Sequence, residues 1–450
     1  MGFVSVPCDN YWGATTQRAI RNFRISNERF PASFIVALAQ VKKACLEANL
    51  ELNLIDNASG KAILQAIDEI LEKGKFMDQF PIDVFQTGSG TQINMNMNEV
   101  LANRANEILG YPLGRNSPVH PNDHVNKSQS SNDVVPTAMH LSTLHQINAK
   151  LLPSLEKLQR TLSKKRREFR EVVKVGRTHL QDAVPIRLST ELEVYQHQIE
   201  ISRKRLKIAC SELCLLPLGG TAVGTGIDAP TNFGRISVSI LREISGFAFK
   251  TNPVKAEGIA SHNSIVYISS LLRLLALSVL KMVNDIRWMG SGPRAGLGEL
   301  VLPSNEPGSS IMPGKVNPTQ AEALIQVCLQ VMGNDATISF AEAFGSTLDL
   351  NTTKPLMIIN LLRSIEILAN GIDSFVENCL KGLKVNRRQI DSQLTSNLMT
   401  ITSLVPFIGY DKASEIAQIA ARTGKTVKQV ALEMKVKGNL DELLDPRKMV

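Results

Sequence analysis

The strongest constraint on the fold is a series of five long stretches with helical periodicity, which begins near residue 132. In the first stretch, leucines and an isoleucine recur every three or four residues from Leu141 to Leu162, which places them on one helical face. The other stretches cover about 189–214, 263–289, 319–345 and 355–383. Helices of ~25–35 residues would each be ~40–50 Å long. We expect an elongated bundle, and because the apolar faces are too broad for one bundle, an oligomer.

The flanking regions predict two smaller, mostly helical parts. Helical patterns precede the bundle at 34–52, 58–75 and about 94–109, and follow it at 411–423 and 427–434. We therefore predict a mainly α fold with three domains. These are a mixed, mostly helical domain at 1–130, the five-helix bundle at 131–387, and a small helical domain at 388–450.

Two local features qualify this helical reading. Residues 83–86 (Asp-Val-Phe-Gln) form a short apolar piece that resembles a strand. Pro153 lies inside the first long helical stretch and could kink the helix there.

Composition excludes several classes of protein. Of 450 residues, 43% are apolar and 20% are charged, which is typical of a soluble globular protein. The formal charge of +8 is too small and too dispersed to indicate a nucleic-acid partner. The most apolar run, Ile265 to Val283, contains Arg273 and Lys281, so we expect a buried bundle helix rather than a membrane span.

The six cysteines form no Cys-x-x-Cys pair, and we interpret them as reduced thiols in a reducing compartment. Asp9, Asn10 and Arg18 come too early for a secretory signal peptide. These features favour the cytoplasm, although a mature mitochondrial chain could look the same.

The segment with the clearest chemical character is the loop at 308–318, Gly-Ser-Ser-Ile-Met-Pro-Gly-Lys-Val-Asn-Pro. Thr319 and Glu322 then fit a helix-capping box, so a glycine-rich loop with hydroxyls and a cation leads into a helix N-terminus. Free N–H groups and the helix dipole make such a place suitable for an anion. The loop is not a nucleotide phosphate loop, because five residues separate its glycines and Val316 follows the lysine.

Four polar junctions, of which this loop is one, precede long helices. The others are Thr87 to Gln92, Ser128 to Asp133 and Gly176 to Asp182. Successive helix starts in an up-and-down bundle lie at opposite ends, so the four junctions cannot easily meet within one subunit. We therefore predict a site shared between chains of an oligomer.

These blocks resemble the sequence pattern of the fumarase/aspartase superfamily, and the resemblance covers effectively the whole chain. The glycine block Leu218 to Gly226 adds a fifth match. The Pro-Gly-Lys-Val-Asn-Pro form of the loop is similar to that of class II fumarases, whereas aspartases usually have alanine in place of Gly314. Aspartases also tend to have Asn in place of His120 and Gln in place of His179.

The resemblance implies a metal-independent and cofactor-free fumarate hydratase of the tricarboxylic acid cycle, which removes water from (S)-malate by anti elimination. It also implies a homotetramer. Loss of the C3 proton gives a carbanion whose charge must be held by preorganised donors and cations. Lys315 and Asn317 fit this task.

Residue by residue, the resemblance makes Ser309 the base that takes the C3 proton. A serine hydroxyl is a weak base, so this role needs loop N–H groups and Lys315 to stabilise the alkoxide. His179, paired with Glu322, would handle the proton of the leaving water, because histidine titrates near neutral pH. The residues that would bind the substrate carboxylates and hydroxyl are Ser89, Thr91, Ser130, Ser131, Asn132 and Thr178.

Considered singly, these residues have simpler explanations. Ser131 alone would be a helix N-cap, Glu322 alone part of the capping box, and His179 alone a surface or packing residue. The joint occurrence of all the blocks, in order, is what favours the catalytic interpretation.

The segment from His120 to His124 admits a further interpretation. In fumarases, the corresponding His-Pro-Asn-Asp segment forms a second dicarboxylate pocket, the B-site, which would here contain His120, Asn122 and Asp123. The family often has basic residues just before this segment, where this chain has Ser117-Pro118. A metal site is disfavoured, because Pro121 and the Asn-Asp pair form a turn and no third ligand cluster is evident.

Two rival functions remain. One is an aspartate ammonia-lyase of the same superfamily, against which His120, His179 and Gly314 argue. The other is a scaffold protein that kept the fold without activity, against which the joint retention of Ser309, Lys315, His179 and Glu322 argues.

Overall fold

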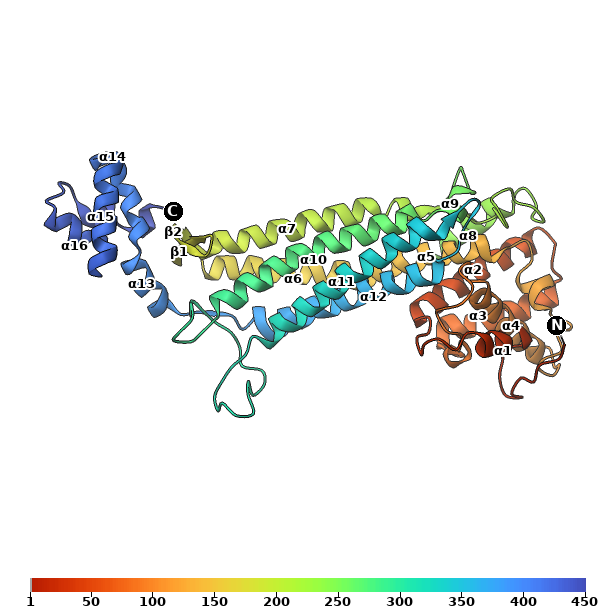
Figure 1. The fold of residues 1–450 in the computed structure, drawn as a ribbon. Coiled ribbons are helices and arrows are strands. Elements are labelled where there is room, and N and C mark those ends of the chain that lie inside the picture. Colours follow the sequence, from red (N-terminus) through yellow and green to blue (C-terminus); the bar gives the residue numbers. More distant parts are fainter. Residues whose placement is uncertain (1) are drawn as a thin grey trace. The chain divides into compact units, whose positions relative to one another are not determined.

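The computed structural model describes residues 2–450, which group by their contacts into two compact units. The first unit comprises residues 1–153, 204–274 and 329–367, and the second comprises 154–203, 275–328 and 368–450. The chain is mainly α-helical, as predicted (Figure 1). The division into domains at 1–130, 131–387 and 388–450 stays a prediction.

Five helices contribute residues to both units, counted over residues 2–450. They are α6 (Leu152–Glu168), α7 (Leu188–Ala209), α10 (Asn263–Met289), α11 (Thr319–Gly345) and α12 (Lys354–Phe375). Polar side chains join neighbouring helices. In the second unit, the Tyr195 hydroxyl of α7 donates to Asp285 of α10 at 2.7 Å. In the first, Arg273 of α10 pairs with Asp335 of α11 at 2.7 Å. The predicted bundle helices are therefore present and packed together.

The helices around the bundle belong to one unit each. The first unit holds α1 (Ala14–Asn22), α2 (Ala32–Glu51), α3 (Asn57–Lys73), α4 (Thr91–Ile108), α5 (Ser131–Gln146), α8 (Phe233–Ser245) and α9 (Glu257–Ala260). The second holds α13 (Arg387–Ser396), α14 (Val405–Ile408), α15 (Tyr410–Thr423), α16 (Val427–Glu433) and α17 (Leu440–Leu443). The apolar residues of α15 and α16 share one cluster with Leu404 and Leu440, which gives the C-terminal helices a common core.

The strands form two-stranded pairs. In the second unit, β1 (Val173–Thr178) and β2 (Gln181–Arg187) make an antiparallel hairpin, and β5 (Leu300–Val301) pairs with β8 (Lys384–Val385). In the first unit, β3 (Leu215–Leu216) pairs with β4 (Lys250–Thr251), and β6 (Ser346–Thr347) with β7 (Leu350–Asn351).

The helix irregularity expected near Pro153 is present. A π-helical turn at Ile147–Leu151 separates α5 from α6, immediately before Pro153. Since proline has no N–H for the preceding helical carbonyl, an irregularity at this point is physically reasonable.

The strand predicted at 83–86 is wrong, because Asp83 forms only an isolated bridge with Arg29 among the described residues. Its carboxylate instead accepts from Ser26 and Phe85 and holds a turn.

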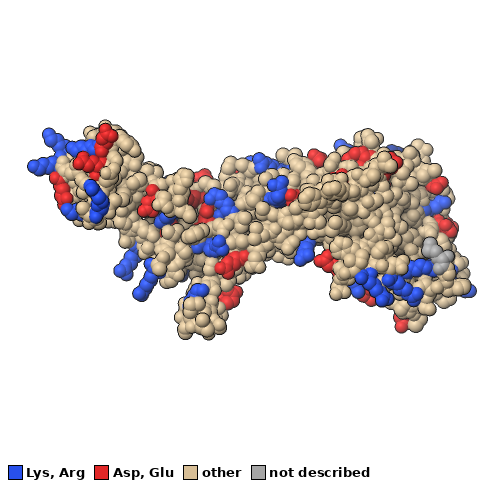
Figure 2. Space-filling view, viewed as in Figure 1, with Lys and Arg blue, Asp and Glu red and all other residues tan. Residues whose placement is uncertain are grey.

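The helices α10 and α12, the latter with its continuation to Leu380, are long and apolar enough to cross a membrane. However, 50% and 56% of their most apolar windows are buried within residues 2–450, as in the core helices of soluble proteins. On the face drawn in Figure 2, basic and acidic side chains are interspersed rather than gathered into one patch.

Candidate active site

In the first unit, three hydroxyls connect the starts of helices α4 and α5. Ser89 Oγ lies 2.8 Å from Thr91 Oγ1, which in turn lies 3.0 Å from Ser131 Oγ. Gly90, with φ 77°, is the residue before α4 and provides no side-chain cap. The N-termini of two helices, with the positive ends of their dipoles, therefore lie beside these hydroxyls, an arrangement that suits a carboxylate. Three of the predicted substrate-binding residues are thus together.

The start of α5 differs from the expectation at Ser131. The N-cap is Ser130, whose side chain accepts from Asn132 N, while Asp133 accepts from Ser130 N to complete a capping box. Ser131 is the first helical residue. Its hydroxyl is therefore not used in capping and is available to Thr91.

Asp133 also fixes the glycine block that follows β3. Its Oδ2 atom accepts from Gly219 N at 2.9 Å and from Thr221 N at 3.0 Å. Asn132 Nδ2 donates to Ala222 O at 2.9 Å. Burial raises the pKa of Asp133 to about 6, although the backbone donors oppose this shift. The buried carboxylate thereby connects two of the sequence blocks within one unit.

A buried lysine supports the other hydroxyl-bearing loop. Lys354 N donates to Gly88 O at 3.0 Å, and Lys354 Nζ donates to Asn351 O at 2.7 Å. A Cβ atom on Gly88 would lie 1.3 Å from Thr352 O, so only glycine allows this approach. Burial lowers the pKa of Lys354 to about 7, and Glu342 opposes the shift. A lone lysine in the sequence gives little signal of this role.

A second buried lysine holds the chain before α5. Lys42 Nζ donates to Asn126 Oδ1 at 3.0 Å and to Gln129 Oε1 at 2.9 Å. Burial lowers the pKa of Lys42 to about 7. Its position within the apolar pattern of α2 is the sequence signal that could have identified it.

In the second unit, the loop at 308–317 is folded around Ser309. The Ser309 Oγ atom accepts from Ile311 N at 3.2 Å and from Met312 N at 3.0 Å. Two N–H donors aimed at one hydroxyl oxygen favour its deprotonated form. The loop closes on itself, because Gly308 N donates to Lys315 O at 2.9 Å and Asn317 Nδ2 donates to Gly308 O at 2.6 Å. Lys315 is exposed, and Ser309 and Asn317 are half-buried.

The capping box predicted for Thr319 and Glu322 is wrong. Helix α11 begins at Thr319, so the residue before it is Pro318, and Glu322 N donates to Pro318 O at 3.0 Å. The Thr319 hydroxyl instead donates to Glu306 Oε2 at 2.8 Å. The Glu322 side chain is therefore exposed and unused in capping.

His179 lies at the tip of the β1–β2 hairpin, which the sequence did not predict. Thr178 pairs with Gln181, and the two residues between them, His179 and Leu180, have φ angles of 56° and 59°. Positive φ at both central residues defines a type I′ turn, which normally favours Asn and Gly. Such uncommon backbone is often found at functional sites. Thr178, His179 and Leu180 are all exposed.

The predicted site residues are divided between the two units. No hydrogen bond or ion pair joins His179 to Glu322 among residues 2–450. The hydroxyls of Ser89, Thr91, Ser130 and Ser131 belong to the first unit. The residues Ser309, Lys315, Asn317, Glu322, Thr178 and His179 belong to the second.

The candidate B-site residues form a capped turn. His120 Nδ1 accepts from Asn122 N and Asp123 N, each at 3.2 Å, at the start of the π-helical turn Pro121–Val125. Asp123 Oδ2 lies 3.3 Å from the same nitrogen. Among residues 2–450, no group of three or more His, Cys, Asp and Glu side chains is arranged to hold a metal ion.

Comparisons with known proteins agree across the chain. A lyase family matches residues 2–333, and the fumarase C C-terminus family matches residues 401–450. The class II fumarate hydratase of Thermosynechococcus vestitus is 49% identical over 96% of this chain and 92% of its own. That of Nitrosomonas europaea is 48% identical over 100% of this chain and 97% of its own. The crystal structure of recombinant class II fumarase from Schistosoma mansoni superposes with a TM-score of 0.95 and 39% identity, covering 99% of this chain and 97% of the other.

Proposed function

The chain belongs to the class II fumarate hydratases, hydro-lyases that interconvert malate and fumarate, and we propose that Ser309 and His179 carry the two proton transfers of this reaction. The observation that carries this assignment is the geometry of the 308–317 loop. Two backbone N–H groups point at Ser309 Oγ, at 3.0 and 3.2 Å.

In the elimination direction, Ser309 as alkoxide takes the C3 proton of (S)-malate. The C–H electron pair moves toward the neighbouring carboxylate, and Lys315 and Asn317 hold the charge that develops there. Collapse of this intermediate forms the C2–C3 double bond and breaks the C2–O bond. His179, partnered by Glu322, gives a proton to the leaving oxygen, which departs as water.

The substrate carboxylate is held at the paired N-termini of α4 and α5. Ser89, Thr91 and Ser131 form a continuous chain of hydroxyls at this place. Ser130, Asn132 and Thr178 complete the proposed substrate contacts. Asp133 and Lys354 act indirectly, because Asp133 accepts from Ser130 N and Lys354 N donates to Gly88 O, which fixes the backbone beside the substrate-binding groups.

We further propose that the active site is shared between the chains of a homotetramer. The support is the exposure of Thr178, His179, Lys315 and Glu322, the groups proposed to act on the substrate. Apolar side chains on the long helices are also exposed, including Leu277, Leu329 and Phe344. Exposed apolar residues in such number indicate an interface with other chains. We propose neither a nucleic-acid partner nor a membrane partner.

The cysteines Cys8, Cys45, Cys210, Cys214, Cys328 and Cys379 are all free thiols. Free thiols in this number suit a reducing compartment, and we place the enzyme in the cytoplasm.

Ultraviolet absorbance tests the reaction and its closest rival together. Purified protein in chelator is mixed with (S)-malate, and a parallel sample receives (S)-aspartate. Absorbance that rises with malate alone supports a metal-independent fumarase. A rise with aspartate alone would mean an ammonia-lyase, and no rise with either would favour a scaffold that lacks activity.

A further inference from the structure

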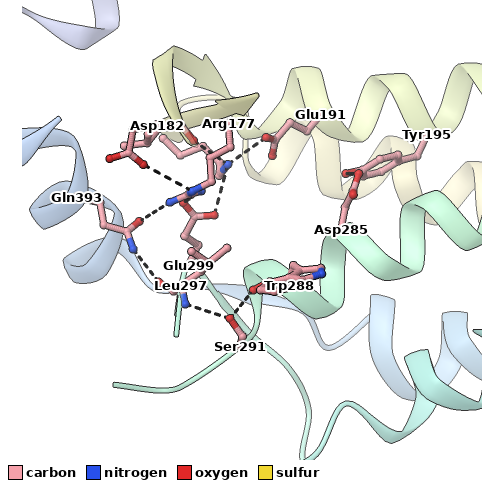
Figure 3. Close-up of polar contacts among 12 residues, drawn as sticks. Arg177, Asp182, Glu191, Tyr195, Asp285, Trp288, Ser291, Leu297, Glu299 and Gln393 are labelled. Atoms are coloured by element: carbon pink, nitrogen blue, oxygen red, sulfur yellow. Dashed lines mark hydrogen bonds and ion pairs between the residues drawn. The ribbon is translucent and has the colours of Figure 1, made fainter. Parts of the chain in front are cut away.

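One buried carboxylate connects the hairpin that carries His179 to the segment that leads to Ser309. Glu299 is 0% exposed, and its Oε1 atom accepts from Arg177 Nη1 at 2.7 Å (Figure 3). Its Oε2 atom lies 3.4 Å from Lys174 Nζ, which also donates to Glu191 at 3.0 Å. Two cations of β1 therefore hold a single acidic side chain 122 residues from Arg177.

The hairpin is bent so that both cations reach this carboxylate. Lys174 and Arg177 are three residues apart, and strict alternation would place them on opposite faces of β1. The pairing of Val175 with Pro185 and of Arg177 with Asp182 leaves an extra residue on β2, which is a β-bulge. Opposite the bulge is Gly176, where a Cβ would lie 2.6 Å from Val184 O. The bulge increases the local twist, and Gly176 makes room for it.

Glu299 is itself firmly anchored by its backbone. Its N–H donates to Met289 O at 2.9 Å, at the end of α10, and its carbonyl accepts from Asn386 N at 2.8 Å. Gln393 adds a second link, because its Oε1 atom accepts from Arg177 Nη2 at 3.4 Å and its Nε2 atom donates to Leu297 O at 2.8 Å (Figure 3). The Arg177 guanidinium is thus held twice by the same chain segment.

Arg177 lies directly before the turn that carries His179, so its contact with Glu299 bears on the position of that turn. Thr178 and the turn residue His179 follow it directly, and both are exposed. Arg177 is fixed by a buried, charge-assisted hydrogen bond, so the strand residue that leads into the His179 turn has a defined position. We propose that Glu299 is a positioning residue for the hydration reaction, which sets the orientation of His179 by holding Arg177 and Lys174.

This inference rests on the proposed role of His179. Loss of the Glu299 charge leaves Arg177 with only the longer, 4.0 Å contact to the more exposed Asp182 as an anionic partner, so the guanidinium shifts and the hairpin tip shifts with it. A displacement on the order of 1 Å at a catalytic group can reduce turnover about 100-fold. Because Glu299 is proposed to act on a proton-transfer group and not on carboxylate binding, we expect the change in kcat and little change in KM.

The first experiment compares Glu299→Gln with Glu299→Asp and with a matched control. Glu69 is also a buried carboxylate, paired with Arg104 through two contacts of 2.8 Å, and Glu69→Gln makes the same chemical change elsewhere. We expect Glu299→Gln to lower kcat about 100-fold and Glu299→Asp to recover part of that loss. We expect Glu69→Gln to lower thermal stability alone. If Glu299→Gln also lowers only stability, the inference is wrong.

The second experiment combines Glu299→Gln with His179→Asn. If Glu299 acts through His179, the double variant is about as slow as His179→Asn alone. If the fold-losses in kcat of the two single variants multiply in full, Glu299 acts independently of His179. That result would contradict this inference and leave the proposed function intact. A His179→Asn enzyme with full activity would instead contradict the proposed function, and this inference with it. Should Glu299→Gln fail to fold, Gln393→Ala replaces it in the same cycle, with an expected loss of about tenfold in kcat.

Discussion

Thr91 Oγ1 lies 3.0 Å from Ser131 Oγ, so the first turns of two helices whose starts are 40 residues apart share a pair of hydroxyls. Each hydroxyl can rotate to donate to a ligand, and each lies in the first turn of a helix, near the positive end of its dipole. The pair is therefore well suited to one carboxylate of a dicarboxylate substrate.

Replacement of Thr91 by valine keeps the shape of the side chain and removes this hydroxyl. A hydrogen bond to a charged group contributes about 1.5–3 kcal/mol, so we expect kcat/KM for malate to fall about 10- to 100-fold. The control is Thr87→Val, since Thr87 is exposed in the same loop. Equal kcat/KM values for the two variants would contradict the proposed contact.

Replacement of Asp133 by asparagine introduces a donor where the carboxylate accepts from Gly219 N and Thr221 N. Both backbone N–H groups then lose their acceptor in a fully buried site, and we expect a loss of about 3 kcal/mol in the free energy of unfolding at pH 8. Since burial raises the pKa of Asp133 to about 6, the wild-type carboxyl is largely protonated at pH 5. Because the fold binds this proton more tightly than the unfolded chain does, wild type gains stability on acidification that Asp133→Asn cannot gain, so the difference between them, measured by urea unfolding, should widen at that pH. A difference that is the same at both pH values would contradict this account.

The buried His140 predicts a loss of stability in acid. Burial lowers the pKa of this histidine from 6.5 to about 4, and its Nδ1–H donates to Leu213 O at 3.0 Å. The unfolded chain therefore binds the proton more tightly than the fold does. Its contribution, about 3 kcal/mol, is complete above pH ~6.5 and is lost as the pH falls toward ~4.

Asp133 has the opposite effect on the free energy of unfolding over part of this range. Its raised pKa makes the fold bind the proton more tightly than the unfolded chain does between about pH 4 and 6, so it adds stability as the pH falls. The informative quantity is thus the difference between wild type and His140→Gln. Urea midpoints measured from pH 8 to pH 4.5, at one protein concentration, should converge as the pH falls. Parallel curves would show that His140 does not titrate as expected.

Mixed oligomers test whether the site is shared between chains. Subunits with Ser309→Ala and subunits with Thr91→Val are unfolded together, refolded and assayed at malate concentrations well below KM. If Ser309 and Thr91 of one site come from different chains, about one quarter of the sites in a random mixture carry neither change. Activity clearly above that of either parent is expected. No gain would indicate that both residues of a site come from one chain.

The long helices could be predicted from the sequence because their apolar periodicity is sustained over many turns. The pattern at 263–289 and 319–345 coincides with α10 and α11 at both ends. The β1–β2 hairpin could not be predicted in the same way, because Lys174 and Gly176 interrupt any apolar alternation and the turn is His-Leu rather than Asn-Gly. Tertiary contacts, above all those of Lys174 and Arg177 with Glu299, stabilise it instead.

The candidate site was predictable only in part, because a sequence reveals local motifs but not partners that are distant in the chain. Sequence blocks identified the hydroxyls of Thr91 and Ser131, and the structure places them in contact. The buried charges Lys42, Glu299 and Lys354 were missed, since a charged residue in a sequence gives no sign of a partner that is distant in the chain. The capping box predicted at Thr319 was wrong because the Thr319 hydroxyl donates instead to Glu306, which lies before the loop.

The most direct test of the central claim compares Ser309→Ala with Ser310→Ala. The two hydroxyls are adjacent in one loop, but Ser309 Oγ is the one that accepts from Ile311 N and Met312 N. Fumarate formation from (S)-malate, followed by absorbance, should fall by about 10³-fold or more in Ser309→Ala and by less than about tenfold in Ser310→Ala. Oligomer mass and thermal stability should be unchanged in both. A Ser309→Ala enzyme that retains most of its kcat would contradict the assignment of Ser309 as the base.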